Sequence, residues 1–155
     1  MWRLDDDSYL LAPIPFDIFQ FMENHNIDYG YLSIGSEIES CVVGLWEAVE
    51  HYAEQNGAST EFYRKWKYPM YYFNNFEISR RSIWTSQEYR SYIDYIDHKG
   101  GIYFHRWGDA PIKSLGVTLT VQEKRTFCFR DVIQYHHSVY NLPPGFPHHN
   151  ISEIH

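Results

Sequence analysis

The chain has 155 residues with two cysteines, so it is long enough to bury the core of one domain without disulfides or structural metals. Its formal net charge of -7, from 20 acidic and 13 basic residues, argues against a sequence-independent grip on nucleic acid, and an anionic ligand would need a cation between itself and the protein. No apolar run approaches the roughly 18 residues of a membrane helix and no signal peptide is recognisable, so we expect no membrane segment in this sequence.

The first element is an apolar segment that ends in three carboxylates. Asp5, Asp6 and Asp7 follow directly after residues 2–4. Clustered carboxylates at a sheet edge suit a divalent cation, because Mg²⁺ and Mn²⁺ prefer oxygen ligands. The alternative is a solvated and frayed terminal segment, which acidic runs often form.

The next elements alternate between helix and strand. A short helix is predicted over residues 17–24, followed by a strand over residues 29–34. A second helix is predicted to begin at Ser36, which forms a capping box with Glu39, and to stop at Gly57. This alternation indicates an α/β domain.

Polar residues mark the middle of the chain. Residues 58–70 show no clear period and are predicted to form a loop with room for one helical turn. Residues 71–78 have strand propensity but carry Asn74, Asn75 and Glu77. A purely structural strand tends to avoid such side chains, so this segment is predicted to contribute to a functional site.

A third helix is predicted over residues 86–99, with Thr85 and Glu88 as its capping box and Gly100 in its terminator. Residues 102–104 then have the character of a strand.

The last predicted helix begins at Asp109, which could cap it, with Pro111 in its first turn. Residues 125–132 are predicted as the last strand, and residues 144–155 as an irregular tail. The expected class is an α/β sheet with helices packed on it.

Five segments occur in an order that resembles one known family. They are Trp2–Asp7, Asn75–Ile78, Tyr95–Gly101, Arg106–Pro111 and Ile133–His137. The resemblance is to glycosyltransferase family 15, the fungal α-1,2-mannosyltransferases of the Golgi, and covers residue 2 to about residue 144. Its most specific part is Arg-Trp-Gly-Asp-Ala-Pro after a Gly-Gly turn.

The resemblance implies an enzyme with a GT-A-like fold, in which a mixed sheet carries flanking helices. It also implies a GDP-mannose donor and a Mn²⁺ cofactor. The reaction would transfer mannose to the 2-hydroxyl of a mannose-containing glycan acceptor, with retention at the anomeric carbon.

The resemblance also implies a set of metal ligands. The family's acidic motif reads Glu-Pro-Asp after Trp-Arg-Val, so Asp5 and Asp7 occupy the positions of its two carboxylates. The family's metal-ligating histidine falls on His137, with Gln134 in place of the usual glycine and His136 as the adjacent alternative. A cation held by Asp7 and His137 would stabilise a diphosphate leaving group as a Lewis acid.

Glu77 is the catalytic candidate that the resemblance implies. Retention needs either a carboxylate nucleophile or a carboxylate that steadies an oxocarbenium-like sugar on a same-face path. The sequence leaves both routes open. Outside this context, Glu77 would be interpreted as an edge-strand carboxylate in solvent.

Three polar residues are candidates for substrate binding. Asp109 either caps its helix or accepts hydrogen bonds from sugar hydroxyls. Arg3 either reaches a donor phosphate or pairs with Asp5 or Asp7. Asn75 belongs to the same predicted group because it lies in the polar strand segment.

Aromatic residues make up 19% of the chain, and sugar rings often pack on aromatic faces. The candidates for such stacking are Tyr71, Tyr72, Trp107 and Tyr135. Each of them could equally belong to the core.

The position of the acidic motif predicts a partial catalytic domain. Four residues precede Asp5, whereas GT-A enzymes place their base- and ribose-binding strands before this motif, in domains of well over roughly 200 residues. We therefore expect residues 1–155 to form a single domain, the acceptor-side, C-terminal part of a GT-A domain that lacks the N-terminal nucleotide-binding strands. Such a sheet should have an exposed edge that invites association.

The leading functional prediction is a retaining α-1,2-mannosyltransferase, or a truncated remnant of one, that uses GDP-mannose and Mn²⁺. The first alternative is an inactive glycan-binding module that keeps only the acceptor cleft. The second is a metal-dependent phosphodiesterase built on Asp5, Asp7 and His137, which the acidic balance disfavours. The resemblance implies the Golgi lumen, although the N-terminal anchor helix of the family is not found in this sequence.

Overall fold

The structure of the chain is a computed structural model that describes residues 1–137 and 139–141. Its main sheet has four strands in the order β1-β6-β3-β7. They are β1 (Trp2–Leu4), β6 (Phe76–Ser79), β3 (Tyr29–Tyr31) and β7 (Thr126–Cys128). β6 runs antiparallel to β1 and to β3, whereas β3 and β7 are parallel, so the sheet is mixed. The tail predicted for residues 144–155 lies outside the described residues.

β1 forms one edge of this sheet and β7 forms the other. Within the described residues, no strand pairs with the outer side of β1. The sheet therefore has an open edge next to the acidic segment, as expected. Association through that edge stays a prediction.

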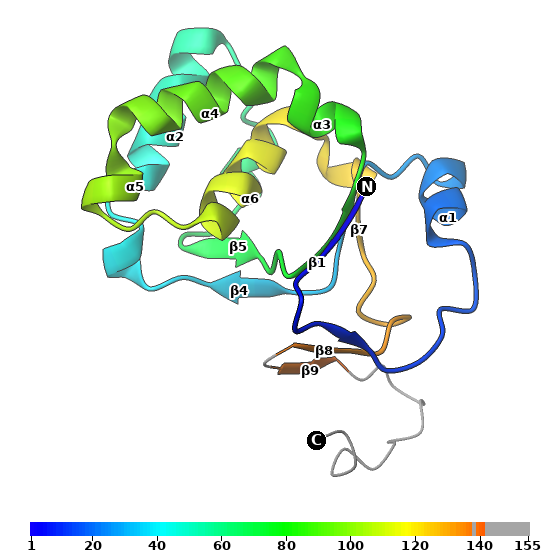
Figure 1. The fold of residues 1–155 in the computed structure, drawn as a ribbon. Coiled ribbons are helices and arrows are strands. Elements are labelled where there is room, and N and C mark those ends of the chain that lie inside the picture. The colour runs from blue at the N-terminus through cyan, green and yellow to red at the C-terminus, as the bar shows by residue number, and fades with distance from the viewer. Residues whose placement is uncertain (138, 142–155) are drawn as a thin grey trace.

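Helices cover both faces of the main sheet (Figure 1). One side carries α2 (Leu45–Asn56), α3 (Arg81–Thr85), α4 (Gln87–Lys99), α5 (Gly101–Phe104) and α6 (Asp109–Thr120). The opposite side carries α1 (Ile18–Asn24). Among the described residues, no helix combines the length and the hydropathy that crossing a membrane requires.

Alternation along β6 separates two apolar cores, because successive side chains of a strand point to opposite faces. Phe76 and Ile78 pack with Ile18 and Met22 of α1. Glu77 points to the other face, where it pairs with Lys113 of α6. The two faces of one strand therefore differ in chemical character.

Two smaller sheets complete the fold. β4 (Ile34–Ser36) pairs with β5 (Met70–Tyr72), and β8 (Tyr135–His137) pairs with both β2 (Tyr9–Leu10) and β9 (Val139–Asn141). Short 3-10 helices lie at Glu39–Cys41, Tyr63–Lys65 and Glu123–Arg125. Since β2 follows the acidic segment and β8 contains His137, the β2-β8 pair joins regions that are far apart in the sequence.

The predicted start of the first helix and the predicted glycine ends of two later helices are confirmed in the structure. Asp17 caps α1, because its Oδ1 accepts hydrogen bonds from the backbone N–H of Phe19 at 2.9 Å and of Gln20 at 3.0 Å. Gly57 and Gly100 end α2 and α4 with φ of 61° and 70°. That left-handed conformation favours glycine at both positions.

The predicted start of the second helix is wrong. Ser36 pairs with Met70 in the β4-β5 sheet, and Glu39 begins a 3-10 turn. α2 begins at Leu45, after Gly44 with φ of 74°. Pairing with a distant strand therefore prevails over the local capping box.

Three predicted strands are shorter than expected. The segment 71–78 is divided by a turn at Asn74–Asn75 into the end of β5 and most of β6. The segment 29–34 is likewise divided between β3 and β4, and the last strand is reduced from 125–132 to β7. The turn at Asn74–Asn75 matters most, because it places two amide side chains at the end of the main sheet.

Two details near α4 also differ from the prediction. Ser86 rather than Thr85 caps α4, since the Ser86 Oγ accepts a backbone N–H bond at 3.1 Å. Residues 102–104 belong to helix α5 instead of a strand. The Trp107 ring packs so closely on Gly101 that an added Cβ there would lie 2.2 Å from it, so only glycine fits at the first residue of this helix.

Candidate functional site

Asp5, Asp7 and His137 come together beyond the end of β1. Each offers one ligand atom, and these atoms all lie within 4.8 Å of one another. A turn after β1 carries the carboxylates, with the Ser8 N–H donating to the Asp5 carbonyl at 3.0 Å. His137 arrives on β8, which is paired with β2. The three predicted metal ligands therefore form one cluster.

Asn75 connects the members of this cluster. Its Nδ2 donates to Asp5 Oδ2 and lies 2.9 Å from His137 Nε2. The same Nε2 is 2.8 Å from Asp7 Oδ1. Two carboxylates and one imidazole nitrogen are a donor set that suits Mn²⁺, and a divalent cation would offset the negative charge that they concentrate. The residues therefore fit the metal that the sequence predicts.

Arg3 links the cluster to the first turn of α6. Its Nε lies 3.3 Å from Asp5 Oδ1, and its Nη1 donates to Asp109 Oδ2 at 3.1 Å. Of the two interpretations of Arg3, the ion pair with Asp5 is observed, whereas contact with a donor phosphate stays a prediction. The guanidinium adds a fixed positive charge beside the carboxylate cluster.

Asp109 does not cap α6. Gly108 occupies the N-cap position without a side-chain cap bond, and Asp109 is the first residue of the helix. Asp109 Oδ2 instead accepts hydrogen bonds from Arg3 and, at 2.8 Å, from Asn74 Nδ2. Burial alone would raise the pKa of Asp109, but the bonds from Arg3 and Asn74 outweigh it and lower that pKa below its ordinary value. Asp109 is therefore held as a carboxylate at the edge of the site.

Glu77 lies in the interior of the sheet and is 1% exposed. The interpretation as an edge-strand carboxylate in solvent is therefore wrong. Its Oε1 accepts from Lys113 Nζ at 2.5 Å, and its Oε2 accepts from the Tyr29 hydroxyl at 3.2 Å. Burial and then the charge of Glu77 raise the pKa of Tyr29, so this hydroxyl keeps its proton for the bond. Lys113 also lies 4.8 Å from the centre of the Trp84 ring.

The aromatic candidates for sugar stacking mostly lie in the core. Tyr72, Trp107 and Tyr135 are 1%, 6% and 2% exposed. The Tyr72 ring packs against Tyr31 at a centroid distance of 4.4 Å, and the Trp107 Nε1–H donates to the Val43 carbonyl at 2.8 Å. The structure therefore assigns these three rings to packing, and they do not join the site.

Two residues of the site were not identified from the sequence. Lys113 lies one helical turn after Asp109, and this i,i+4 spacing places both on one side of α6. That spacing is a usable signal, provided the helix start is known. Tyr29 carries no comparable signal, because its role depends on the strand register that sets β3 beside β6.

Comparison with known proteins identifies a family. The family model described as Glycolipid 2-alpha-mannosyltransferase matches residues 1–146. The chain is 31% identical over 153 residues to the probable mannosyltransferase KTR3 of Saccharomyces cerevisiae, covering 92% of this chain and 38% of that protein. It is also 31% identical over 152 residues to glycolipid 2-alpha-mannosyltransferase 1 of Candida albicans, covering 92% of this chain and 35% of that protein.

Solved structures agree with this match. The mannosyltransferase Ktr4p of S. cerevisiae in complex with GDP superposes with a TM-score of 0.83 at 27% identity, over 92% of this chain and 41% of that chain. The Mn/GDP form of core-mannan synthase A of Aspergillus fumigatus superposes with a TM-score of 0.81 at 25% identity, over 92% and 43%. The predicted GT-A-like class, a mixed sheet with flanking helices, is confirmed. The chain spans less than half the length of the relatives it matches.

Proposed function

This chain belongs to the glycolipid 2-alpha-mannosyltransferase family, and from that premise we propose that it forms the metal- and acceptor-binding part of a retaining α-1,2-mannosyltransferase. The donor is GDP-mannose, the cofactor is Mn²⁺, and the acceptor is a mannose-containing glycan. We also propose the Golgi lumen as its compartment. One observation carries the proposal: Arg3 links the cluster of Asp5, Asp7 and His137 to Asp109, and it lies opposite Glu77 in the register of β1 and β6.

Asp5, Asp7 and His137 are the residues that would hold the metal. Mn²⁺ supplies Lewis-acid stabilisation of the diphosphate that leaves when the sugar–phosphate bond breaks. Arg3 is placed to add hydrogen bonds to phosphate oxygens, because its guanidinium already contacts Asp5 of the cluster. The Mn/GDP form of core-mannan synthase A supports this choice of metal and nucleotide.

Glu77 and Asp109 are the proposed sugar-facing carboxylates. Asp109 would accept hydrogen bonds from sugar hydroxyls, with its Oδ2 already oriented by Arg3 and Asn74. Glu77 would act either as the nucleophile or as a fixed charge that steadies an oxocarbenium-like sugar. Its two oxygens are held by Lys113 and Tyr29, and this arrangement favours the fixed-charge role.

Mn²⁺ binding tests the metal part of the proposal. Isothermal titration should show one Mn²⁺ site that Asp7→Asn and His137→Gln each remove. Asp6→Asn is the matched control, since it removes the same charge from the same exposed turn without removing a ligand of the cluster. Binding that survives both ligand changes, or that is lost equally in Asp6→Asn, would contradict the site.

Transfer tests the reaction. GDP-mannose, Mn²⁺ and methyl α-mannoside are incubated with the chain, and the disaccharide is followed by mass spectrometry. Glu77→Gln should abolish its formation while Mn²⁺ binding is kept.

The second candidate function is a mannoside-binding module without transfer. Mannoside binding near Asp109 that is indifferent to Mn²⁺ and to Asp7→Ala, with no transfer product, would favour this function over the first.

A further inference from the structure

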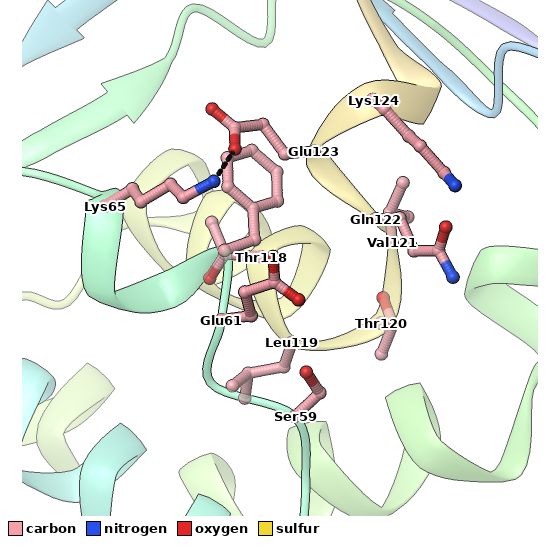
Figure 2. Close-up of a pocket in the computed structure, with 11 residues that line it drawn as sticks. Ser59, Glu61, Lys65, Thr118, Leu119, Thr120, Val121, Gln122, Glu123 and Lys124 are labelled. Atoms are coloured by element: carbon pink, nitrogen blue, oxygen red, sulfur yellow. Dashed lines mark hydrogen bonds and ion pairs between the residues drawn. The ribbon is translucent and has the colours of Figure 1, made fainter.

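A polar cavity (Figure 2) lies at the C-terminal end of α6, the opposite end from Asp109. It has a volume of about 610 Å³ and runs between the segment 59–65 and the segment 118–124. This volume is in the range of small-molecule sites, about 300–1,000 Å³. α6 has 12 residues, so at about 1.5 Å per residue the cavity lies roughly 17 Å along the helix from the candidate transfer site.

The lining of this cavity is rich in both hydrogen-bond donors and acceptors. Glu61, Lys65, Gln122, Glu123 and Lys124 belong to its lining; Lys65 and Glu123 point toward each other, whereas the Gln122 and Lys124 side chains extend away from that pair (Figure 2). The two negative and two positive side chains balance, so the lining does not favour a strongly anionic or cationic ligand. A neutral ligand with many hydroxyl groups can both donate to the carboxylates and accept from the ammonium groups.

An ion pair forms part of the lining of the cavity. Lys65 Nζ lies 2.5 Å from Glu123 Oε2, and the two side chains are 55% and 49% exposed. A pair this exposed contributes little to stability, on the order of 0–1 kcal/mol. Ligand hydroxyls can therefore replace it at little cost, and both partners would remain hydrogen-bonded.

An aromatic cavity of about 310 Å³ adjoins the polar one. The two share Phe62, Lys65 and Glu123 in their walls, so they form two parts of one groove. The second part presents the partly exposed rings of Tyr31 and Trp66. The Trp66 indole is fixed in place, because its Nε1–H donates to a backbone carbonyl at 2.7 Å.

We infer that this groove is a second saccharide-binding site, which takes a short neutral oligosaccharide with one sugar on Trp66 and its neighbour in the polar part. Aromatic rings suit the apolar face of a sugar, and the balanced polar part suits its hydroxyls. The groove would hold an extension of the glycan rather than the reacting mannose, since it lies at the far end of α6. That the sugar is mannose rests on the proposed function.

The test is a chemical-shift titration of the backbone amides with α-linked mannotriose in the presence of EDTA, which keeps the metal cluster out of the measurement. We expect saturable shifts in residues 59–66 and 118–124 and in the Trp66 indole N–H. Inorganic phosphate is the charged comparison ligand and should shift none of these resonances.

Three variants locate the binding. Gln122→Ala and Glu123→Gln change exposed lining residues and should each weaken mannotriose binding about fivefold, the value of one lost hydrogen bond to a ligand. Trp66→Ala should remove the binding, but the Trp66 ring also packs against the core. If the Trp66→Ala variant unfolds, the variants at Gln122 and Glu123 decide the test. Glu54→Gln, on the exposed face of α2, is the matched control and should bind like the parent.

The outcomes separate this inference from the proposed function. Shifts confined to the residues around Asn74 and Asp109 would overturn the groove while supporting an acceptor site there. Shifts in the groove that persist in Asp7→Asn would support the inference even if Mn²⁺ binding or transfer fails. No shifts at millimolar mannotriose, a response to phosphate instead, or equal weakening in Glu54→Gln would each overturn it.

Discussion

The side chains on the two faces of strand β6 are stabilised in different ways. On the α1 side, Phe76 and Ile78 of β6 are 0% and 1% exposed and contact apolar neighbours. On the α6 side, Glu77 of the same strand is just as buried but is held by Lys113 and Tyr29. Neighbouring positions of one strand thus serve packing on one face and a fixed charge on the other.

This difference shows how a buried carboxylate can be kept in place. The apolar face gains stability from the area removed from water and needs no particular partner. The polar face gains little net stability from its ion pair, since desolvation offsets the attraction, but it loses much if one partner is removed. Phe76 and Ile78 therefore stabilise the strand that carries the buried Glu77 carboxylate, and the apolar core on the α6 side adds to that stability.

The largest expected effect comes from breaking the apolar face. Phe76→Ala should lower the free energy of unfolding by about 3–5 kcal/mol, because it leaves a cavity between β6 and α1. Urea unfolding followed by tryptophan fluorescence measures the change. Phe19→Ala removes a ring that is 51% exposed and should cost about 1 kcal/mol or less. Equal losses in the two variants would contradict the assignment of Phe76 to a packed face.

The next effect comes from breaking the polar face. Lys113→Met should cost about 3 kcal/mol, because it leaves the Glu77 carboxylate buried without its cation. The double variant Glu77→Gln/Lys113→Met should lose clearly less than the sum of the two single losses, since no charge is then left unpaired. Lys113→Arg keeps the charge and serves as the control. Additive losses in the double-variant cycle would show that the pair is not coupled.

A third effect tests the carboxylate cluster beyond the end of β1. Mn²⁺ at about 100 times its dissociation constant should stabilise the folded chain by about 2.7 kcal/mol, because binding favours the folded state. Asp5→Asn should remove most of this gain, and EDTA should reverse it. Thermal unfolding with and without Mn²⁺ measures it. A gain of the same size in Asp5→Asn would exclude this carboxylate as a ligand.

The smallest expected effect concerns the rim of the polar face. The folded chain lowers the pKa of Asp109 below its unfolded value, so the resulting stability is present above the unfolded pKa and is lost as the pH falls through the folded pKa. The Asp109 side chain is 67% exposed, so the contribution should stay below about 1 kcal/mol. The difference in unfolding free energy between the parent and Asp109→Asn should therefore be present at pH 7 and shrink below about pH 4. Strong salt should also reduce it; a difference that grows on acidification would contradict the sign.

Features set by neighbouring residues could be predicted from the sequence. The start of the first helix near Asp17 and the glycine ends at Gly57 and Gly100 depend on contacts within one helical turn. The start of α2 could not be predicted, because the capping box of Ser36 competes with a strand partner, Met70, that is remote in sequence. Local propensity is overruled wherever a distant strand provides the backbone hydrogen bonds.

The candidate site likewise has a part that could be predicted from the sequence and a part that could not. The resemblance placed Asp5, Asp7 and His137 in one group, and the structure brings them together. The partners of Glu77 could not be predicted, because Lys113 is 36 residues away in the sequence and reaches Glu77 only in the folded chain. The burial of Tyr72 and Trp107 could not be predicted either, because aromatic residues occur both in protein cores and in sugar-binding sites.

The pairing of β2 with β8 has a consequence for the order of folding. Asp7 and His137 are about 130 residues apart, so the cluster cannot exist until nearly the whole described chain has closed on itself. Contacts of such long range are expected to form after the folding transition state, and interactions absent from that state slow unfolding without speeding folding. Bound Mn²⁺ should therefore lower the unfolding rate, which lengthens the lifetime of the folded chain, and should leave the folding rate almost unchanged.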